Sequence, residues 1–126
     1  MFVRFRRAQR QVKDFYRTVG EKKETAQTNI GVQDIPLVAV VGSVGRAHEL
    51  DRRFRSKQRG WSERHQQIEA RMRQGKWLPP IKLFLFRKEE RTEYFVLDGH
   101  HRMAVALKLG LKTISAEVVE VIVKPV

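Results

Sequence analysis

One segment, residues 94–107, constrains the fold of this chain more than any other. An apolar strand over residues 94–97 runs into Asp98 and Gly99, and His100, His101 and Arg102 then open an apolar helix. Glycine permits the sharp turn and lets a ligand approach the backbone closely. A helix N-terminus offers unpaired backbone N–H groups and a partial positive charge. The junction therefore predicts a site for an anion such as phosphate.

The side chains at this junction suit phosphate oxygens. Arg102 can donate two parallel hydrogen bonds to them. His100 and His101 are neighbours and diverge by about 100° on a helix, so one can face a ligand while the other packs or orients a loop. Three roles are possible for Asp98: it could cap the helix, bind Mg²⁺ or act as a base. We expect no zinc site, because adjacent helical histidines chelate poorly and no matching carboxylate spacing is visible.

The composition predicts the sign of the charge on a binding partner. The 126 residues carry a net charge of +12 with a pI near 10.7, which predicts attraction to polyanions such as DNA, RNA or nucleotides. Solvated surface Lys and Arg would account for the same charge. The chain has no cysteine, which excludes disulfides and every thiol mechanism.

The sequence also predicts a cytoplasmic protein with no membrane partner. No apolar run approaches the roughly 20 residues that span a bilayer, and arginines interrupt the N-terminus too often for a signal peptide. The absence of cysteine fits a reducing compartment.

Residues 1–31 are predicted as a basic amphipathic helix, over residues 2–19, followed by a polar linker over residues 20–31. Apolar residues recur at helical spacing, with six Arg or Lys between them. Such a helix either contacts phosphates or docks on a partner, or it packs on its own domain with a solvated basic face. The oligomeric state stays open, and a dimer is one possibility.

Residues 32–126 are predicted as one compact α+β domain. The apolar run 35–41 indicates a buried strand, and the glycine-containing loop 42–46 brings Ser43 and Arg46 among the candidate ligand-binding residues. A charged helix is expected over residues 47–57. The remaining elements are a helix over 62–73 capped by Ser62, a hairpin over 81–97, a helix ending at Gly110 and a strand over 113–123. His65 belongs to the apolar stripe of its helix, so we expect a residue at the edge of the core.

Over residues 33–123 the chain resembles the ParB/sulfiredoxin superfamily. The resemblance rests on the apolar first strand, the hairpin, the last strand and the box Asp98-Gly99-His100-His101-Arg102. ParB proteins carry Gly-Glu-x-Arg at this place and sulfiredoxins carry Gly-Gly-Cys-His-Arg. The resemblance implies a small mixed sheet flanked by helices, with nucleotide phosphates bound at the box.

Three branches of this superfamily lead to different expectations. His100 stands where sulfiredoxin has its cysteine, which excludes that reductase chemistry. No helix-turn-helix region follows the box, so operator-specific DNA binding of the ParB kind is not expected. The free serine kinases have an Asp-Gly-His box and a His-Glu pair after the first strand, and His48 and Glu49 lie at a comparable place.

Three functions follow. The first is binding of ATP, ADP or CTP with Mg²⁺ by Gly99 to Arg102, with or without hydrolysis or phosphoryl transfer, in which Glu49 or Asp98 would position a hydroxyl or water. The second is a non-enzymatic DNA- or RNA-binding module using the N-terminal helix and the basic cluster 52–59. The third is a metal-dependent nuclease using Asp98, His100 and Glu49.

Overall fold

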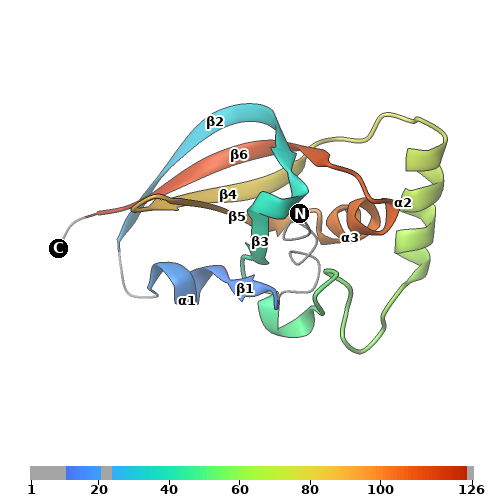
Figure 1. The fold of residues 1–126 in the computed structure, drawn as a ribbon, viewed down its shortest axis with the longest axis horizontal. Helices are drawn as coiled ribbons and strands as arrows, with labels where there is room; N and C mark the ends of the chain where they lie inside the picture. The colour runs from blue at the N-terminus through green and yellow to red at the C-terminus, as the bar shows by residue number, and fades with distance from the viewer. Residues whose placement is uncertain (1–10, 21–23, 125–126) are drawn as a thin grey trace, which may run out of the picture.

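A computed structural model describes residues 11–20 and 24–124 and shows an α+β fold built on one six-stranded mixed sheet (Figure 1). The elements are β1 (Lys13–Asp14), α1 (Phe15–Val19), β2 (Thr25–Pro36), a 3₁₀ turn η2 (Leu37–Ala39), β3 (Val40–Ser43), a 3₁₀ turn η3 (Ala47–Glu49), α2 (Glu63–Arg73), β4 (Ile81–Lys88), β5 (Arg91–Asp98), α3 (His100–Leu109) and β6 (Thr113–Val123). The predicted fold class is confirmed.

The sheet order is β1-β3-β5-β4-β6-β2. The β4–β5 hairpin and the β2–β6 pair are antiparallel, whereas β1–β3, β3–β5 and β4–β6 are parallel. Helices α2 and α3 contact each other and lie together beyond one end of the sheet, while α1 lies beside β1 (Figure 1). The carboxyl end of β5 therefore delivers α3 toward α2.

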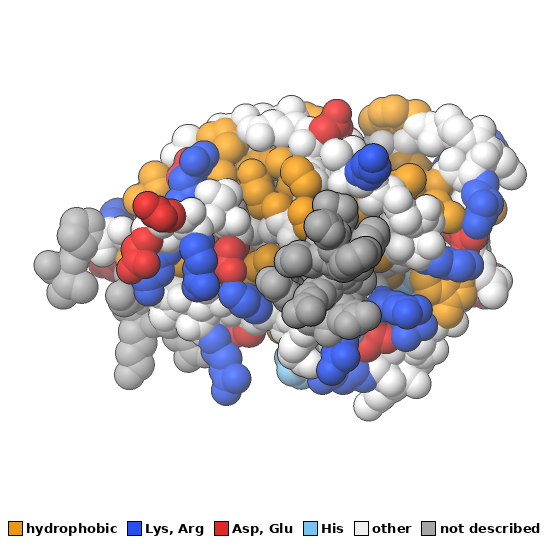
Figure 2. All heavy atoms as spheres, viewed as in Figure 1, with side chains coloured by type: hydrophobic (Ala, Val, Ile, Leu, Met, Phe, Trp, Pro, Cys, Tyr) orange, Lys and Arg blue, Asp and Glu red, His pale blue; other side chains and the backbone are white. Residues whose placement is uncertain are grey.

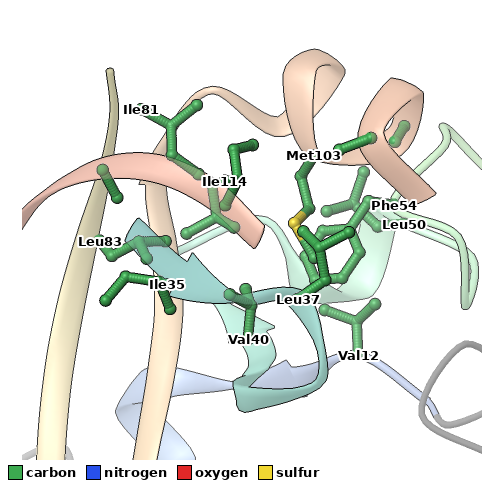
Figure 3. Close-up of a cluster of buried hydrophobic side chains, with 14 of the residues drawn as sticks. Val12, Ile35, Leu37, Val40, Leu50, Phe54, Ile81, Leu83, Met103 and Ile114 are labelled. Atoms are coloured by element: carbon green, nitrogen blue, oxygen red, sulfur yellow. The ribbon is translucent and has the colours of Figure 1, made fainter. Parts of the chain in front are cut away.

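Alternate residues of the central strand β4 supply two separate cores. Leu83 and Leu85 belong to the larger cluster, which Met103 of α3 joins, and Figure 3 shows Leu83 and Met103 within it. Phe84 and Phe86 point to the opposite face and pack with a second cluster that includes Phe15 of α1. Because successive side chains of a strand point to opposite faces, the sheet is buried on both sides at β4.

The two longer helices begin and end close to the residues that the sequence indicates. Ser62 caps α2 by accepting the backbone N–H of His65, as predicted. Gly110 ends α3 in the left-handed conformation, also as predicted. The predicted hairpin and the strand 113–123 are confirmed, with β5 extending to Asp98.

The predicted linker 20–31 is wrong, because most of it belongs to β2. This strand lies at the edge of the sheet and pairs with β6 from Thr25 to Pro36, with one irregularity between Asn29 and Val32. Nearly all of its residues are exposed. A strand that buries neither face carries no alternating apolar pattern, so its sequence is polar and aperiodic like that of a loop.

The predicted strand 35–41 is two strands separated by a turn. Its first residues end β2, η2 forms a turn, and Val40 begins β3. The backbone N–H of Leu37 donates to the carbonyl of Lys112, which holds η2 against the start of β6. Gly42 and Ser43, predicted as loop, belong to β3. A Cβ on Gly42 would lie 2.3 Å from the carbonyl oxygen of Lys13, so glycine here lets β1 pair with β3.

The predicted helix 47–57 is also wrong, since only η3 is helical. Asp51 Oδ1 accepts the backbone N–H groups of Arg53 and Arg55, at 2.8 and 3.0 Å, which folds the segment into a turn. Phe54 takes a positive φ of 64° and is 1% exposed. Burial of this ring outweighs the helical preference of the charged residues around it.

Only part of the predicted N-terminal helix can be compared with the structure. Lys13 and Asp14 form β1, not helix, and α1 covers Phe15–Val19. Asp14 caps α1 by accepting the N–H of Arg17 at 3.0 Å. The rest of the predicted helix, residues 2–10, lies outside the described residues.

Candidate functional site

The pocket that brings half of the candidate residues together has a volume of about 470 Å³. Four parts of the chain enclose it: the region of η3, the loop before α2, the first turn of α2 and the first turn of α3. Its lining residues are Arg46, Glu49, Leu50, Phe54, Ser56, Gln58, Arg59, Gly60, Ser62, Glu63, Arg64, His65, His100 and His101. We call it the α2–α3 pocket.

Two helix N-termini contribute to this pocket. His100 and His101 are the first two residues of α3, and residues 62–65 run from the N-cap of α2 through its first turn. The caps differ, because Ser62 caps α2 with its side chain, whereas Gly99 at the N-cap of α3 supplies none. The first N–H groups of α3 therefore have no side-chain acceptor at the cap.

Three guanidinium groups line the pocket. Arg46 lies 3.4 Å from Glu49, measured between Nε and Oε1. Arg59 and Arg64 form no ion pair with any residue that the structure describes. In the space-filling view, Lys and Arg side chains gather over the segment between η3 and α2 (Figure 2). Together with the helix N-termini, these cations favour a bound anion.

His100 forms the inner wall of the pocket. It is 5% exposed, and its Nε2 lies 2.7 Å from Oγ of the fully buried Ser43. Burial and, to a smaller extent, the nearby Arg46 together lower the pKa of His100 from 6.5 to about 4, against the opposing charge of Asp98. His100 is thus neutral at pH 7, and its ring is fixed by β3.

His101 stands in a row of rings at the edge of the pocket. Trp61 stacks on His65 at 4.5 Å between centroids, and His65 lies 4.6 Å from His101. Burial, Arg46 and Arg64 lower the pKa of His101. An anion bound beside Arg46 and Arg64 would offset their charge and favour protonation of His101.

His65 serves the helix cap and the core. Its Nδ1 accepts the backbone N–H of Ser62 at 3.0 Å, so in the neutral ring the proton resides on Nε2. The apolar stripe predicts a residue at the edge of the core; with an exposure of 2% His65 is buried, and it also borders the pocket. Burial lowers its pKa.

Gly99 is dictated by packing. Its φ is +110°, a value that residues other than glycine rarely adopt. A Cβ there would lie 2.5 Å from Cγ2 of Ile81. The turn from β5 into α3 therefore needs glycine whether or not a ligand is bound.

Arg102 and Asp98 point elsewhere. Arg102 donates from Nη1 to the carbonyl of Pro79, and its Nε is buried without a hydrogen-bond partner among the described residues. Asp98 is exposed at the end of β5, opposite Lys82, and does not cap α3. Neither residue lines the α2–α3 pocket.

The structure thus assembles part of the predicted site and adds to it. Arg46, Glu49, His100 and His101 line one pocket, and Ser43 supports it from beneath. Sequence reasoning missed Arg64 and Glu63 as site residues and assigned Arg59 only to a basic cluster. The Ser62 cap was the available signal, since it marks a second helix N-terminus with an arginine in its first turn.

Within residues 11–20 and 24–124, no group of three or more His, Asp and Glu residues is arranged to hold a metal ion. In the same ranges, no helix has the length and apolarity needed to cross a bilayer.

Comparison with known proteins finds similarity among solved structures. No protein-family model and no curated protein matches the chain. Among solved structures, a sulfiredoxin from Arabidopsis thaliana is similar at 22% identity and a TM-score of 0.46, over 69% of this chain and 82% of that chain.

Proposed function

We propose that the α2–α3 pocket binds the phosphate groups of a nucleoside di- or triphosphate such as ATP, ADP or CTP. One observation carries this proposal. Arg59 and Arg64 line a pocket at two helix N-termini, and neither guanidinium forms an ion pair with a described residue. Both side chains are exposed to solvent, and together with the helix N-termini they attract an anion into the pocket.

The uncapped start of α3 supports the same assignment. A phosphate seated against His100 and His101 would accept the first N–H groups of α3, for which Gly99 supplies no side-chain acceptor. Arg46 would exchange part of its contact with Glu49 for a phosphate oxygen. A volume of about 470 Å³ also falls in the usual range for small-molecule sites.

The pocket also offers carboxylates. Glu49 and Glu63 line it, and hard oxygen ligands of this kind suit a Mg²⁺ ion brought in with a nucleotide, where it would neutralise phosphate charge. If the pocket hydrolyses nucleotides or transfers phosphate, Glu49 is the residue in place to orient a water or hydroxyl. The predicted catalytic role of Asp98 is untested, and Asp98 does not line the pocket.

Isothermal titration with adenosine, AMP, ADP and ATP, with and without Mg²⁺, tests the proposal. Each added phosphate should tighten binding, and adenosine should bind at least tenfold more weakly than ATP. Comparing the affinities for CTP and ATP shows whether the pocket distinguishes between bases. Equal affinities for adenosine and ATP, or no binding of either, would refute phosphate recognition. Release of inorganic phosphate from bound ATP would establish hydrolysis.

A second candidate function is binding of nucleic acid without catalysis. The specific observation is a second basic groove, to which Arg53 and Arg55 of the predicted cluster 52–59 contribute. The N-terminal helix of that hypothesis lies largely outside the described residues. The metal-dependent nuclease gains no support, since His100 is bonded to Ser43 and Asp98 does not line the pocket.

A further inference from the structure

The second groove lies on the α3 side of the loop between η3 and α2. Its volume is about 410 Å³, and its lining residues are Arg53, Arg55, Trp61, Ala104, Leu107 and Lys108. Alternate residues of the loop serve different concavities, since Phe54 and Ser56 line the α2–α3 pocket while Arg53 and Arg55 line this groove. The two are therefore separate sites built from one loop.

Cationic side chains line the groove. Three of its six lining residues are basic and none is acidic. Arg55 is bonded to Asp51 at 2.9 Å and Lys108 to Glu69 at 2.7 Å, whereas Arg53 is exposed and forms no ion pair within the described part of the chain. This charge attracts an anionic partner.

The groove also contains a rigid aromatic ring. One face of Trp61 stacks on His65 with an interplanar angle of 22°, which fixes the indole. The Lys108 ammonium lies 4.8 Å from the indole centroid, and Trp61 remains partly exposed. Ala104 and Leu107 of α3 add an apolar wall. A flat apolar body can rest here between positive charges.

We propose that this groove binds an unpaired nucleobase of a single-stranded nucleic acid, with the flanking phosphates on Arg53, Arg55 and Lys108. A fixed indole beside arginines is the combination by which proteins hold single strands, because every base has a π-face and every linkage a negative charge. A base can reach a ring inside a groove only when it is neither paired nor stacked in a duplex. Lys108 lies over the ring and would turn from it toward a phosphate.

An acidic peptide would satisfy the same cations, but it would leave the indole and the apolar wall without a matching group. The nucleobase uses both features, so we favour it. The assignment deepens the second candidate function, on which it rests, and does not depend on the nucleotide site, because no residue lines both concavities.

Fluorescence anisotropy with a labelled oligothymidine of about 12 nucleotides tests this assignment, with the same sequence as a duplex and a glutamate-rich peptide as competitors. Trp61→Ala should weaken binding about tenfold, the scale of one lost stacking contact. Trp77→Ala is the matched control, since Trp77 is 79% exposed and outside the groove, and should retain wild-type affinity. The duplex and the peptide should compete poorly.

Four further measurements keep the test independent of folding and of the nucleotide site. Trp61→Phe should retain most of the affinity, and oligothymidine should quench Trp61 fluorescence in a Trp77→Phe background. Arg53→Ala should lower the slope of log affinity against log salt by about 1. Arg64→Ala should bind oligothymidine normally. Equal effects of Trp61→Ala and Trp77→Ala, absence of quenching, or equal competition by duplex or peptide would overturn the assignment.

Discussion

Ser43 Oγ and His100 Nε2 lie 2.7 Å apart, and both side chains are buried. Ser43 ends β3 and His100 begins α3, so this hydrogen bond ties the sheet to the helix N-terminus at the floor of the α2–α3 pocket. The backbone N–H of the next residue, Val44, donates to the carbonyl of Val96 in β5, which keeps Ser43 in register. The pocket thus has one wall fixed by the sheet.

Replacing this serine should destabilise the protein. Ser43→Ala leaves a ring nitrogen of His100 buried without its partner, which should lower the free energy of unfolding by about 1–3 kcal/mol. Urea denaturation followed by circular dichroism measures the change. Ser115→Ala is the matched control, because Ser115 lies on β6 and its side chain is partly exposed. It should change the free energy of unfolding by less than about 0.5 kcal/mol. Equal effects of the two substitutions would contradict the role of the bond.

Stability should fall as the solution becomes acidic. The pKa of His100 is about 4 in the folded protein and 6.5 in the unfolded chain, so between these values the unfolded chain binds more protons. The free energy of unfolding therefore decreases as pH drops from 6.5 to 4 and levels off below. One pKa unit corresponds to about 1.4 kcal/mol, which puts the loss at about 3 kcal/mol.

His100→Gln isolates that contribution, because it removes one titrating group and leaves the carboxylates in place. The difference in unfolding free energy between wild type and variant should change by about 3 kcal/mol across this pH window. Burial also lowers the pKa of His65 and His101, so the variant should keep a weaker dependence of the same sign. A difference that is constant from pH 7 to pH 4 would contradict a neutral buried His100.

The turn before α3 should reject any side chain. Gly99→Ala combines a positive φ with a contact of 2.5 Å to Ile81, so we expect a loss of about 2–5 kcal/mol. Gly110→Ala is the control, because φ is +69° there but nothing lies within 4 Å of the added Cβ. That variant should lose only about 1 kcal/mol. Both values come from denaturation curves, and similar losses would show that the contact with Ile81 is unimportant.

Arg102 should matter more for stability than for ligand binding. Its guanidinium donates to the Pro79 carbonyl and does not line the α2–α3 pocket. Arg102→Ala should therefore lower the free energy of unfolding by about 1–2 kcal/mol and change ATP affinity less than threefold. A tenfold loss of ATP affinity at full folding would return Arg102 to the phosphate site, where the sequence motif places it.

Much of the fold could be predicted because the signals were local. Each of these signals depends on a few neighbouring residues: the Ser62 cap, the Gly110 end of α3 and the alternation in residues 113–123. The edge strand β2 could not be recognised, because it buries almost nothing and is specified by its partner β6. The turn at Asp51 was missed because a side-chain acceptor and the buried Phe54 ring outweigh a charged, helix-like composition.

The site was less predictable than the fold. The Asp98–Arg102 box led to the N-terminus of α3, but the chain brings Arg59 and Arg64 to the same pocket from a different segment. Only the packing of α2 against α3 creates that proximity. The orientation of Arg102 toward Pro79 likewise depends on the path of the segment before β4, which no local pattern encodes.

The most direct test of the central claim compares ATP binding by Arg59→Ala, Arg64→Ala and the double variant with Arg87→Ala. Arg87 lies on the β4–β5 hairpin, pairs with Glu120 at 3.1 Å and is absent from the pocket. Isothermal titration at fixed salt should show a loss of about tenfold for each pocket arginine, a larger loss for the double variant and wild-type affinity for Arg87→Ala. Equal affinity in all four variants would show that nucleotide phosphates do not bind in the α2–α3 pocket.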